Sequence, residues 1–213
     1  MLLYILANLL LLSIGTLSIN LLDRKNALTL IEKYVMGFIL GIALNSFLLF
    51  IFAWGGISIG VVKLVDIVLL IALVFMNYRK YIWRRLISWD VPVYKLTKRD
   101  WFMVPIVLLM LFKAFFSFFN STHVPSYFDD EKGNWNIKSK IIAHAGIIST
   151  SSGSEAYLGG GGHMGYPLNF ILYKAYVAEF MGGWDESYIN LITFLVFNLV
   201  IVLVIFSFPN RLL

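Results

Sequence analysis

The stretch from Tyr34 to Trp54 reads YVMGFILGIALNSFLLFIFAW and contains no charged residue. A helix needs about 20 consecutive apolar residues to cross the hydrocarbon core of a bilayer, so this stretch predicts a membrane span. Similar apolar stretches cover residues 2–22, 57–78, 101–119 and 188–208, and a shorter one covers residues 167–181. The sequence therefore predicts an all-α, polytopic membrane protein with about six membrane segments, of which 167–181 is short enough to be re-entrant instead.

The composition excludes an ordinary soluble domain. Hydrophobic residues make up 60% of the 213 residues and charged residues only 14%, and the mean hydropathy is +0.82. Soluble domains contain roughly 45–50% apolar and about 25% charged residues, so much of this apolar surface must face lipid or other membrane helices. In such a chain the net charge of +5 reports membrane topology, and we expect no nucleic-acid partner. The absence of cysteine excludes disulfides and thiol chemistry.

The basic residues predict the orientation. Loops 23–33 and 79–100 lie on one side under alternating topology, and together they carry most of the lysines and arginines. The positive-inside rule makes that side cytoplasmic. We therefore expect a multi-pass protein of the cell membrane with its N-terminus outside and with the long loop 120–166 outside. Loop 182–187 is expected inside, although it carries Asp185 and Glu186 and no basic residue.

The long outer loop 120–166 contains the residues best suited to chemistry. Asp129 and Asp130 follow the span at 101–119 closely, which places two carboxylates near the outer membrane surface. A carboxylate there can accept a proton from an acceptor hydroxyl, although acidic residues are also favoured simply because they precede a helix. A divalent cation on these carboxylates stays an open alternative. The histidines show no metal-binding spacing, which excludes a zinc site.

A short amphipathic helix is predicted over residues 135–145, with Asn134 as its N-cap. Helical spacing places Trp135, Lys138 and Ile142 on one face of this helix, and it places Lys140 and His144 on another. The apolar residues can rest in the membrane interface while a lysine reaches a phosphate group.

Ionisable residues inside the apolar stretches are candidates for function or for internal pairing. Lys63 and Asp66 are three residues apart, so we expect them to pair with each other. Lys174 lies about 10 Å into its segment and requires a partner or a cavity. Glu179 is expected near the inner end of the same segment, and Lys113 near the outer end of the span at 101–119.

The acidic run at 129–131, the sequence WNIKSK at 135–140 and Gly146 resemble the first outer loop of a family of bacterial membrane glycosyltransferases. The family belongs to the GT-C superfamily, in the branch related to dolichyl-phosphate-mannose-protein mannosyltransferases. The sequences HMGYPL at 163–168 and GGWD at 182–185 are similar to the group's His-Pro-Asp-Tyr-Pro-Leu and Gly-Gly-Trp-Asp pattern. The resemblance covers about residues 100–208, and it departs from the pattern where Gly165 replaces an aspartate.

The resemblance implies an enzyme that transfers a sugar from a polyprenyl-phosphate donor to a hydroxyl of a glycan, lipid or protein acceptor on the extracytoplasmic face. It assigns the catalytic base to Asp129 or Asp130. It places four further residues near the donor phosphate, namely Lys138, Lys140, His163 and Tyr166. No cofactor beyond the open divalent cation is implied.

The resemblance also divides the chain. Residues 1–100 would hold three N-terminal transmembrane helices and the basic cytoplasmic loop, and residues 101–213 would begin a GT-C-like catalytic membrane domain. The chain is then expected to be the N-terminal portion of a larger enzyme. The alternative is a non-catalytic membrane scaffold or a transporter fragment, in which Lys63, Asp66 and Lys174 are pathway or packing residues.

Overall fold

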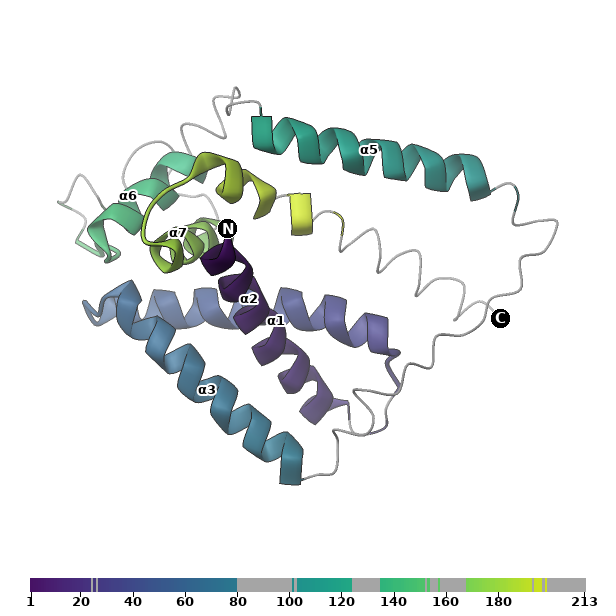
Figure 1. Ribbon diagram of the computed structural model, residues 1–213. Helices are drawn as coiled ribbons and strands as arrows, with labels where there is room; N and C mark the ends of the chain where they lie inside the picture. Colours follow the sequence, from purple (N-terminus) through teal and green to yellow (C-terminus); the bar gives the residue numbers. More distant parts are fainter. Residues whose placement is uncertain are drawn as a thin grey trace.

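The computed structural model describes residues 1–23, 25, 27–79, 101, 103–123, 135–151, 153, 157, 168–192, 194–196 and 198. Its helices are α1 (Leu2–Leu22), α2 (Leu30–Trp54), α3 (Ile59–Arg79), α5 (Met103–His123), α6 (Ile137–Ala145) and α7 (Leu168–Met181) (Figure 1). A further apolar helix, Glu186–Val196, follows α7 and is called the final helix below. Within these residues the only β pairing is an isolated bridge between Ser149 and Tyr157, so the described chain is helical as expected.

Within the described residues, three helices are long and apolar enough to cross a membrane, namely Leu2–Leu22, Leu30–Trp54 and Ile59–Tyr78. The predicted bounds of the first are confirmed, and the second begins one turn earlier than its hydropathy suggests. The cause is a capping box, in which Thr29 Oγ1 accepts from the Glu32 backbone N–H and Glu32 Oε2 accepts from that of Thr29. This reciprocal cap satisfies two N–H groups and starts the helix within polar sequence.

Helices α1 and α2 cross with their backbones in contact. A Cβ atom added to Gly15 would lie 1.7 Å from the carbonyl oxygen of Gly37. A Cβ atom added to Gly41 would lie 2.0 Å from the carbonyl oxygen of Leu11. Small residues spaced four apart, as Gly37 and Gly41 are, permit this close approach between membrane helices.

A buried polar cluster joins the end of α1, the start of α2 and the end of α3. The Lys33 ammonium lies 3.1 Å from Asp23 Oδ2 and donates to Asn20 Oδ1 at 3.2 Å. Asn20 Nδ2 in turn donates to Asn77 Oδ1 at 3.0 Å. Lys33, which the topology argument counts among the basic loop residues, is therefore a buried structural cation.

The Asp23 carboxylate makes this cluster sensitive to acid. Burial acts to raise the pKa of Asp23, but hydrogen bonds from the Ala27 and Leu28 N–H groups and the Lys33 ammonium outweigh it, and the pKa lies below its ordinary value. A depressed carboxylate pKa stabilises the fold above the unfolded-state pKa of about 4, and this contribution is lost as the pH falls through the folded-state value.

We therefore expect acidification from about pH 6 to about pH 3 to lower the melting temperature of the wild-type chain more than that of the Asp23→Asn variant. Thermal unfolding in detergent at a series of pH values measures the difference. Parallel pH profiles for the two proteins would contradict the role of this carboxylate.

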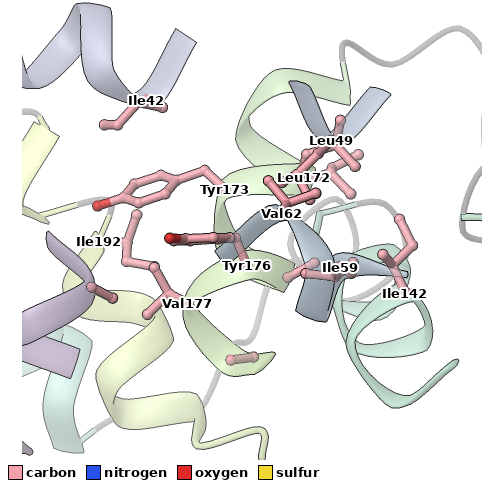
Figure 2. Packing of buried hydrophobic residues seen from close by; sticks show 14 of the residues in the cluster. Ile42, Leu49, Ile59, Val62, Ile142, Leu172, Tyr173, Tyr176, Val177 and Ile192 are labelled. Carbon is pink, nitrogen blue, oxygen red and sulfur yellow. The ribbon is translucent and has the colours of Figure 1, made fainter. Parts of the chain in front are cut away.

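Helix α7 is buried on all sides. Its residues 171–178 are all buried, and they pack against α2, α3, α6 and the final helix (Figure 2). The 14 residues of α7 extend about 21 Å at 1.5 Å per residue, well short of a bilayer core of about 30 Å. A helix whose middle residues are buried on every face, one lysine among them, packs in the protein interior. The shortness that suggested a re-entrant segment therefore reflects a helix enclosed by other helices.

Polar contacts fix both ends of α7 to neighbouring helices. Lys63, in the second turn of α3, forms an ion pair with Glu179 at 3.2 Å, near the C-terminal end of α7. At the N-terminal end of α7, Ser46 Oγ donates to the carbonyl oxygen of Asn169, and Ser46 lies about 12 Å along α2 from Trp54. Glu179 therefore lies beside the start of α3, and its expected place at the opposite, inner end is wrong.

Loop 182–187 consequently lies at the same end of the bundle as the end of α5. Ser187 Oγ donates to the carbonyl oxygen of Thr122 at 3.1 Å, and the rings of Tyr188 and Tyr4 lie 5.6 Å apart. Alternating topology predicts the opposite end of the bundle for this loop, whereas these contacts place it beside the end of α5 and the start of α1.

Candidate functional site

Helix α6 packs against α7, and its C-terminal end reaches the start of α3. The Ile59 backbone N–H donates to the carbonyl oxygen of Gly146 at 2.8 Å, which fixes the end of α6 to the start of α3. Gly146 has φ 65°, a left-handed conformation that ends the helix and lets its N–H bond to Ile142. At the other end Asn136 holds the N-cap position in a helical conformation, and the predicted cap, Asn134, lies outside the described residues.

The side chains of α6 divide between a buried face and an exposed face. Lys138 and Ile142 are each 1% exposed, and Trp135 is half-buried against Phe170 of α7. Lys140 and His144 are exposed on the opposite face. The two lysines that the family resemblance assigns to one phosphate therefore point in opposite directions.

Lys138 is a deeply buried cation. Burial lowers the pKa of its ammonium, because removal from water disfavours the charged form. At the same time an ammonium group in a region of low dielectric attracts an anion far more strongly than one in water does. Lys138 is thus the described residue best placed to stabilise negative charge at this end of the bundle.

A polar chain holds the start of α6 to the helices beneath it. The Lys174 ammonium of α7 donates to Asn136 Oδ1 at 2.7 Å, and Asn136 Nδ2 donates to Asn190 Oδ1 of the final helix at 3.3 Å. The ammonium also lies 5.1 Å from the centre of the Phe170 ring, within the range of a cation–π interaction. Asn136 is therefore one partner of the kind that the depth of Lys174 requires. Asn136 could have been singled out from the sequence, because it belongs to the Trp-Asn motif at residues 135–136 on which the family resemblance depends.

The other predicted site residues, Asp129, Asp130, His163 and Tyr166, lie outside the described residues. So does the open divalent-cation alternative at the two aspartates. In the part of the chain that the structure describes, no group of three or more His, Asp and Glu side chains could hold a metal ion.

The predicted pair between Lys63 and Asp66 does not form. The Lys63 ammonium contacts Glu179 Oε1 and donates to the Glu179 carbonyl oxygen at 2.8 Å. Asp66 Oδ2 instead accepts from Asn45 Nδ2 of α2 at 2.7 Å. The two side chains leave α3 toward different neighbours, so each finds its partner on another helix.

Comparison of the chain with protein-family models, with curated proteins and with solved structures finds no match.

Proposed function

We propose that this chain acts as a membrane glycosyltransferase that takes a sugar from a polyprenyl-phosphate donor. The observation that carries the proposal is helix α6, which follows the acidic run at 129–131 and holds Lys138 inside the bundle. The likeness of this segment to the first outer loop of GT-C enzymes supports the same assignment.

In the proposed reaction a carboxylate acts as the general base, and cationic side chains stabilise the departing phosphate. Asp129 or Asp130 accepts the proton of the acceptor hydroxyl, whose oxygen bonds to the anomeric carbon of the sugar. The bond from that carbon to the phosphate oxygen breaks, and polyprenyl phosphate leaves with the electron pair. Lys138, on the buried face of α6, stabilises the phosphate charge, and the family likeness assigns the same role to His163 and Tyr166.

The test is sugar transfer by the whole protein reconstituted in lipid with a synthetic polyprenyl-phosphate sugar. The double variant Asp129→Asn/Asp130→Asn is expected to lower kcat by about 10²- to 10⁴-fold, the usual contribution of a general base. The single variants identify which carboxylate acts. Asp185→Asn is the matched control, since Asp185 is an exposed carboxylate that accepts from the Ser187 N–H. Undiminished transfer by the double variant would remove the base assignment.

The second candidate is a non-catalytic membrane scaffold or transporter fragment. One observation favours it, the burial of the Asp66 carboxylate about 10 Å along α3. The placement of Lys174 speaks against an open channel at that residue, because its side chain is 1% exposed and packed between Asn136 and Phe170.

A further inference from the structure

Asp66 is a carboxylate in the interior of the helical bundle. It is 1% exposed, and it lies on a helix long and apolar enough to cross a membrane. Within the described residues the two ion pairs are Lys33–Asp23 and Lys63–Glu179, and neither includes Asp66. A buried negative charge costs several kcal/mol unless a positive charge or a proton compensates it.

Two neighbouring oxygen atoms have unused hydrogen-bonding capacity. Asn45 turns its Nδ2 group toward Asp66 and keeps its Oδ1 atom in the same buried region. The Tyr176 hydroxyl of α7 lies beside the Asp66 carboxylate, outside the geometry of a normal hydrogen bond. In the part of the chain described here, Asn45 Oδ1 and the Tyr176 hydroxyl are both buried without a hydrogen-bond partner.

Tyr176 reaches this position because α7 is enclosed by the other helices. Its ring projects from α7 into the cluster formed with α3 and the final helix, on the same side as the ring of Tyr173 (Figure 2). The Tyr173 hydroxyl has its own acceptor in Asn8 Oδ1 of α1. Buried polar groups nearly always find a partner, so the oxygen atoms around Asp66 call for an occupant.

We propose that Asp66, Asn45 and Tyr176 form a binding site for one monovalent metal cation between α2, α3 and α7. Oxygen ligands suit alkali cations, and a single carboxylate balances a single positive charge. A divalent cation would leave a net charge in the bundle. A proton on Asp66 would satisfy one acceptor, whereas a cation draws on several oxygen atoms at once. Transporters hold coupling ions in comparable intramembrane positions.

The test is thermal unfolding of the whole chain in detergent at constant ionic strength, with NaCl or KCl replacing choline chloride. The wild-type melting temperature is expected to rise with one of the metal cations. Above the dissociation constant, each tenfold increase in that cation raises the folded-to-unfolded ratio about tenfold. The Asp66→Asn variant should lose the response, because the charge that binds the cation is gone.

Glu179→Gln is the matched control, since it removes a carboxylate that is already paired with Lys63. This variant should melt at a lower temperature and keep the full cation response. If Asp66→Asn does not fold, Tyr176→Phe should raise the cation concentration at half effect while preserving the packing of the ring. A wild-type midpoint that is identical in NaCl, KCl and choline chloride would overturn the proposal. A cation response that persists in Asp66→Asn, or a midpoint governed by pH alone, would overturn it as well.

Discussion

The Gly15→Ala variant is expected to lose about 3 kcal/mol or more of unfolding free energy, because a methyl group at this position has no space. Its Cβ atom would lie 1.7 Å from the carbonyl oxygen and 2.7 Å from the carbonyl carbon of Gly37. Both of these atoms belong to the backbone, so no side-chain rotation relieves the clash. Helices α1 and α2 must separate instead, and overpacking of this kind is costly.

Gly60→Ala is the matched control for this prediction. Gly60 is also a helical glycine, on α3, and its added Cβ atom would meet Ser58 Oγ at 3.7 Å, an ordinary contact. Because alanine favours helix over glycine by about 1 kcal/mol, this control should melt at the wild-type temperature or above. Thermal unfolding in detergent compares the two variants, and equal midpoints would show that α1 and α2 do not cross as described.

The Asn136→Leu variant is expected to lose about 2–3 kcal/mol, because it removes the acceptor that Asn136 offers to the Lys174 ammonium. Asn136 contacts both α7 and the final helix, so the loss reaches two helices. Leucine is similar in size to asparagine, which keeps the change mainly electrostatic. Lys140→Met is the control on the exposed face of α6 and should change stability by about 0.5 kcal/mol or less.

A double-mutant cycle measures the coupling free energy between Asn136 and Lys174, separately from the other effects of each substitution on stability. If Lys174 and Asn136 act together, Asn136→Leu/Lys174→Met should lose less than the sum of the two single variants, by about 0.5–3 kcal/mol. Strict additivity would mean that the contact contributes nothing of its own.

The sequence predicts the first three helices well, because the thickness of a bilayer sets the length and the hydropathy that a spanning helix must have. The same measure fails for α7. Hydropathy shows only that a residue is apolar. A helix buried in protein can therefore have the same hydropathy as a helix that faces lipid. The pairing of Lys63 with Glu179, which revealed the difference, joins residues far apart in the chain.

The faces of α6 are predictable for a local reason, since helical spacing alone separates Lys138 from Lys140. Partners on other helices are not predictable in this way. Spacing suggested that Lys63 would pair with Asp66, yet each of them contacts a different helix.

The enclosure of α7 has a consequence for biosynthesis. Helices α1, α2 and α3 leave the ribosome well before α7, so the surface that receives α7 already exists when its residues emerge. A ribosome-bound intermediate ending before Leu168 would expose the apolar surface that α7 covers in the folded protein. This surface includes Ile59, Val62 and Leu49. When α7 packs against this surface, the early and late parts of the chain become one cooperative folding unit. Neither half is therefore expected to resist proteolysis without the other.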